Sequence, residues 1–164
     1  MNKELKNKFV KELQSNQGII HKICRAYTKG DAQHKDLFQE ISIQLFNAYP
    51  KFRGDAKFST WMYRVAINTA ISLYRKSKRQ VQTSELFDNL KELEFKDYDD
   101  TKDRQVAMLY QAINKLNDIE KALVLMYLDD KPYVEISDVL GISEVNARVK
   151  MSRAKTKLRN ILNP

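Results

Sequence analysis

Apolar residues recur at helical spacing through the first 50 residues of the chain. The first stripe contains Leu5, Phe9 and Leu13, and the second contains Ile20, Ile23, Cys24 and Tyr27. Glycines and prolines are few and stand where a helix would start or stop, so Gly18 and Gly30 are predicted to bracket the second stripe. A third helix is predicted from Asp36 to Tyr49, closed by Pro50. Three helices are therefore expected before residue 52.

The segment from residue 52 to residue 80 fits two patterns. Large side chains alternate with smaller or polar ones, as a strand would require, but the length of the segment favours a helix from a cap at Ser59 to about Lys78. One face of this helix is expected to pack: Met62, Val65, Ala66, Thr69 and Leu73. The other face is expected to point away from that core: Tyr63, Arg64, Ile67, Asn68, Tyr74 and Arg75.

The last 60 residues predict four more helices. One stripe runs from Val106 to Leu116, and a second helix follows a predicted cap at Asp118. Residues 133–160, "YVEISDVLGISEVNARVKMSRAKTKLRN", then have the form of a helix-turn-helix: a short helix, a turn at Gly141, and a longer helix capped by Ser143. The fold class expected for the whole chain is all-α.

Charge divides the chain into three parts. Its 29 Lys and Arg outnumber its 21 Asp and Glu, which makes a polyanion the natural partner. Residues 81–103 reverse this balance, with eight acidic side chains and three lysines. We therefore predict two small helical domains, 1–80 and 104–164, joined by an acidic linker over 81–103.

Aromatic rings and positive charges are interleaved between residues 52 and 80. Aromatic faces can stack on unpaired bases while Arg and Lys hold the phosphates, so the segment is suited to capturing single-stranded DNA. Phe52, Phe58 and Trp61 are equally suited to shaping the loop.

The final helix is basic on its outward face. It has a packing stripe of Ala147, Met151, Ala154 and Leu158, and from Val145 to Pro164 it carries six basic residues and no acidic one. Arg148 or Arg153 could contact guanine, Asn146 adenine, and Val149 a thymine methyl group. A solvated basic face is the alternative, but the preceding helix and turn favour duplex recognition.

No catalytic signature is recognisable, so the chain is not expected to be an enzyme. Cys24 is the only cysteine, and His21, Cys24 and His34 make a poor zinc signature, so a buried thiol is favoured over a metal site. No cofactor is expected. Nothing in the sequence resembles a signal peptide or a membrane span, so a cytoplasmic location is expected.

Two blocks of the sequence resemble a known family. "DLFQEISIQLFNAYPKFRGDAKFSTWMYRVAINTA" (36–70) and "INKLNDIEKALVLMYLDDKPYVEISDVLGISEVNARVKMSRAKTKL" (113–158) resemble the second and fourth conserved regions of the extracytoplasmic-function sigma factors of bacterial RNA polymerase. The resemblance implies a factor that docks on core polymerase, recognises the -35 and -10 promoter elements, and captures the melted non-template strand. An anti-sigma factor is a further candidate partner. The linker would thread toward the RNA exit path.

The resemblance also implies roles for individual residues. The residues expected to dock on the clamp helices of the largest polymerase subunit are Asp36, Leu37, Gln39, Glu40 and Ile43. The polymerase flap is a further expected contact. Recognition of the -10 region falls to Phe52, Arg53, Asp55, Lys57, Phe58, Trp61, Arg64, Asn68, Ser72 and Arg75. Recognition of the -35 region falls to Ser143, Asn146, Arg148, Val149, Lys150, Ser152, Arg153 and Lys157.

Two other classes remain open on the sequence. A helix-turn-helix regulator that binds duplex operators would explain residues 133–160 but leave the first domain without a role. A nucleic-acid-processing enzyme would need a catalytic cluster that the sequence does not contain.

Overall fold

The computed structural model describes the backbone of residues 1–80 and 101–164, and the side chains of 1–73 and 103–164. Every regular element in these ranges is a helix: α1 (Lys3–Tyr27), α2 (Asp31–Ala48), a 3-10 turn η1 (Tyr49–Lys51), α3 (Phe58–Gln80), α5 (Thr101–Asn114), α6 (Asp118–Leu128), α7 (Tyr133–Leu140) and α8 (Glu144–Leu162). The predicted all-α class is confirmed. Most of the predicted linker lies outside the described residues, and its last three residues belong to α5.

The N-terminal segment forms one helix where two were predicted. α1 runs through Gly18, and Asn2 caps it by accepting a hydrogen bond from the Leu5 amide at 2.8 Å. A glycine inside a helix costs about 1 kcal/mol relative to alanine. Burial of Phe9, Ile20 and the residues that follow them outweighs this cost. The prediction of a break at Gly18 was wrong, and two α-helices precede residue 52.

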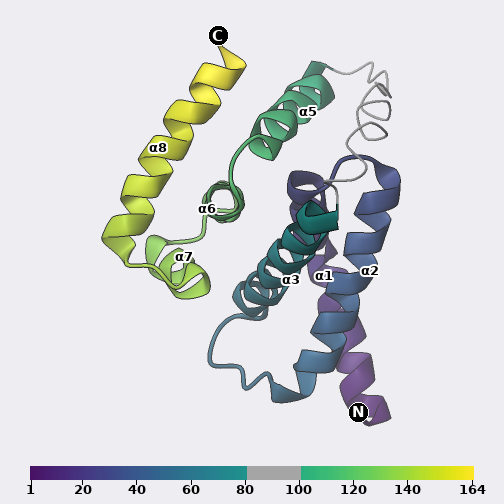
Figure 1. The fold of residues 1–164 in the computed structure, drawn as a ribbon. Helices are drawn as coiled ribbons and strands as arrows, with labels where there is room; N and C mark the ends of the chain where they lie inside the picture. Colours follow the sequence, from purple (N-terminus) through teal and green to yellow (C-terminus); the bar gives the residue numbers. More distant parts are fainter. Residues whose placement is uncertain (81–100) are drawn as a thin grey trace.

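α1, α2 and α3 pack against one another as a three-helix unit (Figure 1). The residues at its centre are fully buried and come from all three helices: Ile20, Ile23, Ile41, Leu45 and Met62. The segment after residue 57 is helical, as its length predicted. The helix starts at Phe58, so Ser59, which was predicted to cap it, lies inside its first turn. The Ser59 hydroxyl instead accepts a hydrogen bond from Lys131.

Local signals place the helix ends of the C-terminal half. Gly141 ends α7 in the left-handed conformation, with φ of 67°, which a glycine adopts without strain. Ser143 caps α8 as predicted, and the predicted stripe from Ala147 to Leu158 is buried. The cap of α6 is Asn117, whose side chain accepts from the Glu120 amide, and not Asp118.

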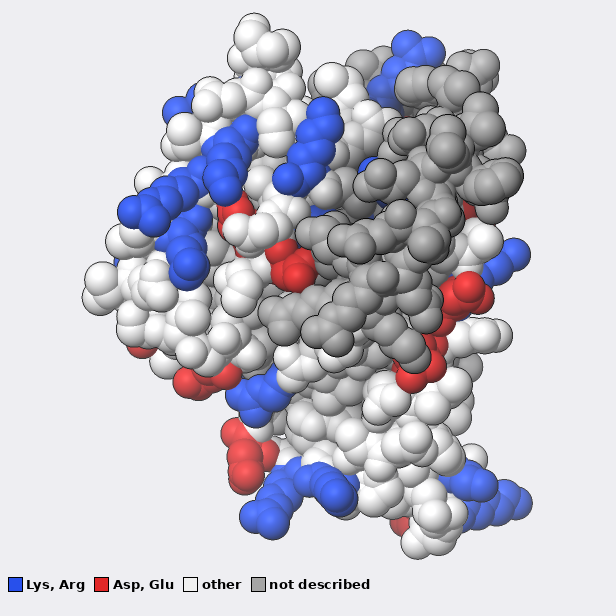
Figure 2. All heavy atoms as spheres, viewed as in Figure 1, with Lys and Arg blue, Asp and Glu red and all other residues white. Residues whose placement is uncertain are grey.

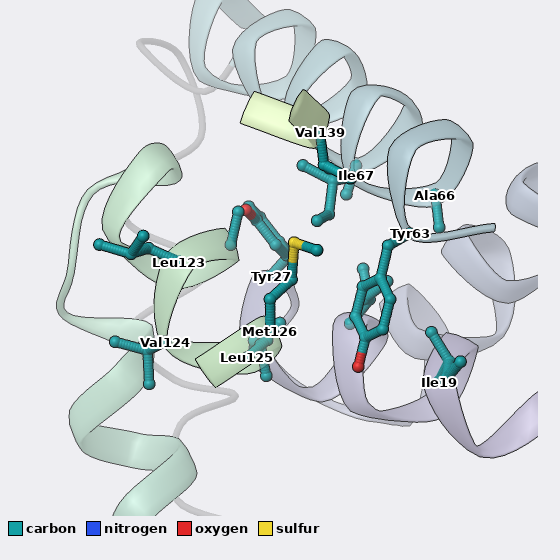
Figure 3. Close-up of a cluster of buried hydrophobic side chains, with 14 of the residues drawn as sticks. Ile19, Tyr27, Tyr63, Ala66, Ile67, Leu123, Val124, Leu125, Met126 and Val139 are labelled. Atoms are coloured by element: carbon teal, nitrogen blue, oxygen red, sulfur yellow. The ribbon is translucent and has the colours of Figure 1, made fainter. Parts of the chain in front are cut away.

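The two halves are in direct contact. α1 packs on α5 and α6, while α3 packs on α6 and α7. Tyr63 and Ile67 were expected to point away from the core, yet they are 0% and 2% exposed. They lie in a cluster with Met126 of α6 and Val139 of α7 (Figure 3). The outward assignment was wrong for these two residues, whereas Arg64 and Asn68 are exposed as predicted. Helical spacing identifies one packed face and cannot reveal a second one that a distant segment buries.

Candidate nucleic-acid interface

The rings around the turn between η1 and α3 form one aromatic cluster. The Trp61 ring lies 4.9 Å from that of Phe52 and 5.4 Å from that of Phe58, measured between centroids. Buried Tyr49 sits beside all three rings at 6.1 to 6.2 Å. These separations are typical of favourable aromatic pairs. The outer three rings remain half-buried, so they shape the loop and still present some surface to solvent.

A hollow of about 190 Å³ opens beside this cluster. Its lining includes five of the residues predicted to recognise the -10 region: Phe52, Arg53, Asp55, Trp61 and Arg64. Lys51, Ala56 and Thr60 complete it. Lys57 lies outside the lining and is exposed. Gly54 turns the chain here with φ of 78°, a conformation that favours glycine.

Arg64 and two other predicted residues on α3 contact or face the C-terminal half. The Arg64 guanidinium donates to the carbonyl oxygen of Asp138 at 3.3 Å. Asn68 and Ser72 line a second cavity, of about 310 Å³, together with Val139 and other residues of α6 and α7. The Arg75 side chain lies outside the described residues.

The exposed side of α2 carries most of the residues predicted to dock on polymerase. Asp36, Gln39 and Ile43 are exposed, and Ile43 is a large apolar side chain with 52% of its surface open. Glu40 is half-buried and accepts a hydrogen bond from Gln44 at 3.0 Å. Leu37 is only 4% exposed, so its side chain belongs to the core and is not available to a partner.

α8 presents most of the predicted -35 residues to solvent. Asn146, Arg148, Val149, Ser152 and Arg153 are exposed. Lys150 is half-buried, and the Ser143 hydroxyl is engaged in the helix cap. Figure 2 shows basic side chains gathered on the side of the molecule where Figure 1 places α8.

Arg148 contacts two neighbouring side chains. Its guanidinium lies 5.0 Å from the centre of the Tyr133 ring and 3.8 Å from the Glu144 carboxylate. Tyr133 was not among the predicted site residues. It begins α7 directly after Pro132, and the contact with Arg148 depends on how α7 and α8 pack, which the sequence pattern does not show.

Lys155 and Tyr127 form a second aromatic–cation pair that the sequence did not reveal. The Lys155 ammonium donates to the Tyr127 hydroxyl at 2.9 Å and lies 4.3 Å from the ring centre. This hydrogen bond raises the pKa of Lys155 above its ordinary value. The Tyr127 and Tyr133 rings are 6.4 Å apart, so the two pairs lie side by side.

The buried thiol predicted at Cys24 is confirmed. Cys24 is fully buried, and burial raises the pKa of its thiol to about 12. His21 Nδ1 and His34 Nε2 come within 3.0 Å of each other. No group of three metal-ligating side chains occurs within residues 1–80 and 101–164. No helix in these ranges is both long enough and apolar enough to cross a membrane.

Family models match both halves of the chain in order. Residues 13–80 match Sigma-70 region 2, and residues 107–158 match Sigma-70, region 4. The chain belongs to the sigma-70 family, in its extracytoplasmic-function group. It is a promoter-recognising sigma factor whose partners are core RNA polymerase and promoter DNA.

Named relatives resemble most of this sigma factor. It is 32% identical to the RNA polymerase sigma-H factor of Pseudomonas aeruginosa over 146 residues, which cover 82% of this chain and 76% of the relative. It is 28% identical to the ECF RNA polymerase sigma-E factor of Escherichia coli K12, over 87% of this chain and 79% of the relative.

Solved structures share the fold. The sigma factor RpoE of Bartonella quintana, in complex with the anti-sigma factor NepR, superposes with a TM-score of 0.73 at 17% identity, covering 94% of this chain and 96% of that one. CnrH, in complex with the cytosolic domain of CnrY, gives 0.69 at 17% identity, over 96% and 89%.

Proposed function

We propose that this sigma factor holds an unpaired base of the -10 non-template strand in the hollow beside Trp61. The observation that carries this proposal is the lining of the hollow, which combines aromatic rings with the guanidinium groups of Arg53 and Arg64. Aromatic faces stack on bases of any sequence, and fixed positive charges attract the phosphates. The exposed Lys57 lies close enough along the chain to extend the phosphate contact.

The energies set a limit on what the factor does alone. Stacking one base on an aromatic ring contributes ~1–3 kcal/mol, while opening one step of DNA stacking costs on average ~1.4 kcal/mol. Capture of one or two bases therefore offsets the opening of only one or two steps. We expect the free factor to bind promoter DNA weakly and nonspecifically, and to gain specificity on core polymerase.

Docking on polymerase is assigned to the exposed side of α2. Asp36, Gln39 and Glu40 supply polar groups beside the exposed Ile43, a combination found at the centre and rim of protein interfaces. The clamp helices of the largest subunit are the proposed partner. Leu37 supports this face from the core.

α8 is the proposed reader of the -35 element. Its N-terminal half exposes Asn146, Arg148, Val149, Ser152 and Arg153, side chains that fit the donor and acceptor pattern of the major groove. Arg148 is held against Tyr133, so its guanidinium enters the groove with part of its side-chain freedom already lost.

The remaining assignments follow from family membership. We propose that the factor is not an enzyme, that it works in the cytoplasm with polymerase, and that the acidic segment 81–103 links two domains and threads toward the RNA exit path. RpoE of Bartonella quintana was solved with an anti-sigma factor, and we propose that this chain has one too.

Co-elution with core polymerase from the same source, followed by run-off transcription on a genomic promoter library, tests the proposal. The wild-type chain should co-elute and yield new start sites, and Gln39→Ala/Glu40→Ala should lose both. Lys8→Ala, exposed on α1 and therefore on a different helix, is the control. Tight binding to duplex sites without any association with polymerase would support the helix-turn-helix regulator instead.

A further inference from the structure

The two histidines of the chain meet on the surface of the N-terminal half. His21 lies on α1 and His34 on α2, and the sequence contains no other histidine. The Nδ1 atom of His21 lies 3.0 Å from the Nε2 atom of His34. His21 is exposed and His34 is half-buried, so solvent reaches the pair. Neither residue has a role in the proposed promoter recognition or polymerase docking.

The hairpin of α1 and α2 restricts the positions of the two rings. Only residues 28–30 separate the two helices, which pack along each other. The His21 ring stacks on the Phe38 ring, with 4.7 Å between their centroids, and on the His34 ring at 5.3 Å. The packing of the helices and the stacking of the rings therefore bring the two nitrogens together before any ligand binds.

The two facing nitrogens can become ligands of one metal ion. In the neutral pair one nitrogen donates a hydrogen bond to the other, so a single hydrogen lies between them. When His21 carries its hydrogen on Nε2 and His34 carries its hydrogen on Nδ1, both facing nitrogens offer lone pairs. Exchange with solvent interconverts these forms. Neutral imidazole is the commonest metal ligand in proteins, and either of its nitrogens can bind.

The separation of the nitrogens favours one class of ion. With bonds of about 2.0–2.1 Å, two nitrogen ligands of one ion are about 2.9 Å apart at a right angle and about 3.3 Å apart at the tetrahedral angle. The observed 3.0 Å is closer to the right angle, which square-planar and octahedral ions require. Ni²⁺ and Cu²⁺ combine this geometry with affinity for imidazole.

Charges of both signs lie near the pair. Burial, the neighbouring His21 and the Arg25 guanidinium lower the pKa of His34, and the Asp31 carboxylate opposes them. A lowered pKa keeps the ring neutral near pH 7, which is the form that binds a metal. The Arg25 guanidinium lies 4.2 Å from the centre of the Tyr110 ring, while Asp31 stands one helical turn before His34 and offsets part of its charge.

We propose that His21 and His34 form a surface site for one divalent transition-metal ion, Ni²⁺ or Cu²⁺ in preference to Zn²⁺, with water in the remaining positions. Cys24, part of the zinc pattern rejected in the sequence, is fully buried and stays outside this site. A bound ion joins α1 to α2. It therefore stabilises the folded state, since the two histidines are 13 positions apart and are not held together in the unfolded chain.

Titration calorimetry of the untagged full chain with Ni²⁺ at pH 8, where imidazoles are neutral, tests the site. A shared site predicts one ion per chain and at least a tenfold loss of affinity in His21→Ala and in His34→Ala. Two independent histidines would instead bind two ions, and each variant would keep one ion at unchanged affinity. Lys35→Ala is the control, because its exposed ammonium has no lone pair for a metal and its loss should leave the affinity at least as high.

Electron paramagnetic resonance of the chain with one equivalent of Cu²⁺ identifies the ligands directly. The wild type should show coupling to two imidazole nitrogens, and each single variant should show coupling to one. This reading of the wild type decides the question even where a variant fails to fold. Coupling to fewer than two nitrogens would overturn the proposal and leave the pair as a hydrogen bond within the hairpin.

Urea unfolding gives a third reading. Ni²⁺ should raise the unfolding midpoint of the wild type and of Lys35→Ala, whereas it should leave the midpoint of His21→Ala/His34→Ala unchanged. The same measurement without metal shows whether the variants are folded. An equal rise for the variant without histidines would place the ion on other side chains and overturn the proposal.

Discussion

The ammonium of Lys157 lies 2.8 Å from Glu120, a carboxylate whose side chain is only 8% exposed. The two residues are 37 positions apart and join α8 to α6. The second oxygen of Glu120 is buried without a protein partner. Burying a carboxylate costs free energy unless a positive charge or a hydrogen bond is nearby, so the first role of Lys157 is to stabilise the domain.

Lys157→Ala is therefore expected to destabilise the fold more than it weakens promoter binding. Removing one partner of a buried pair costs ~3–5 kcal/mol, and the exposure of Lys157 lowers this expectation to roughly 1–3 kcal/mol. Urea unfolding gives the measurement. In a Glu120→Gln background the same substitution should cost much less. An equal cost in both backgrounds would show that the pair is not coupled, and a loss of -35 affinity at unchanged stability would restore Lys157 to the DNA-contact set.

Arg148 is expected to set specificity at one base pair. Arg148→Ala should cost ~1–3 kcal/mol at a preferred guanine and relax the choice there. Tyr133→Leu should have a smaller effect at the same base, about 0.5–1 kcal/mol, since it removes only the ring that orients the guanidinium. The measurement is anisotropy on duplexes selected from a random library by the polymerase-bound factor.

Arg159→Ala is the control for this experiment because Arg159 is exposed near the end of the same helix. It should weaken all sequences alike. If Arg148→Ala also weakens all sequences equally, Arg148 contacts only phosphate, and the assignment to guanine is wrong.

The parts of the fold that the sequence predicted well depend on short-range chemistry. Gly141 and Ser143 determine the turn and the start of α8 through one backbone conformation and one side-chain hydrogen bond. The stripe of Ala147 and Met151 fixes which side of α8 is buried, so its outward residues follow directly. These signals operate within a few residues and need no knowledge of the rest of the chain.

The failures have a common physical origin in long-range packing. Gly18 is tolerated inside α1 because the helix buries Phe9 before it and Ile19 and Ile20 after it. Tyr63 and Ile67 are buried by α6 and α7, more than 50 positions away in the chain. Leu37 shows the same limit of sequence patterns for a residue assigned to polymerase docking. Its apolar side chain belongs to the core, while the neighbouring Asp36 is exposed.

Trp61 is the only tryptophan of the chain, so its fluorescence reports on the hollow directly. Single-stranded DNA should change its emission as a base enters beside the Phe52 and Trp61 rings, whereas duplex bound at α8 should not. Arg53→Ala and Lys57→Ala should each lower the slope of log affinity against log salt by about 0.7, the value for one lost phosphate contact on a single strand. Unchanged emission when a labelled oligonucleotide is fully bound would place the strand elsewhere.

Alkaline pH should unfold the protein through groups that are neutral when buried. Burial raises the pKa of Cys24 from 9.0 to about 12, so the native thiol stays protonated where the unfolded one ionises. Its contribution to stability is complete below pH 9 and is lost as the pH rises from 9 toward 12, with a slope that approaches about 1.4 kcal/mol per pH unit. Burial also raises the pKa of Tyr27 and Tyr63, whose hydroxyls bond across the two halves, so stability falls further above pH 10.

Urea unfolding at pH 8, 9 and 10 measures this dependence. Cys24→Ala is the matched control, because it should be less stable at every pH but lose less between pH 9 and pH 10. A thiol-reactive dye gives an independent reading, since native Cys24 should react far more slowly at pH 8 than the unfolded chain does. Equal pH slopes for the two proteins, or rapid labelling of the native chain, would mean that Cys24 is reached by water and that the α1 core opens more readily than its burial indicates.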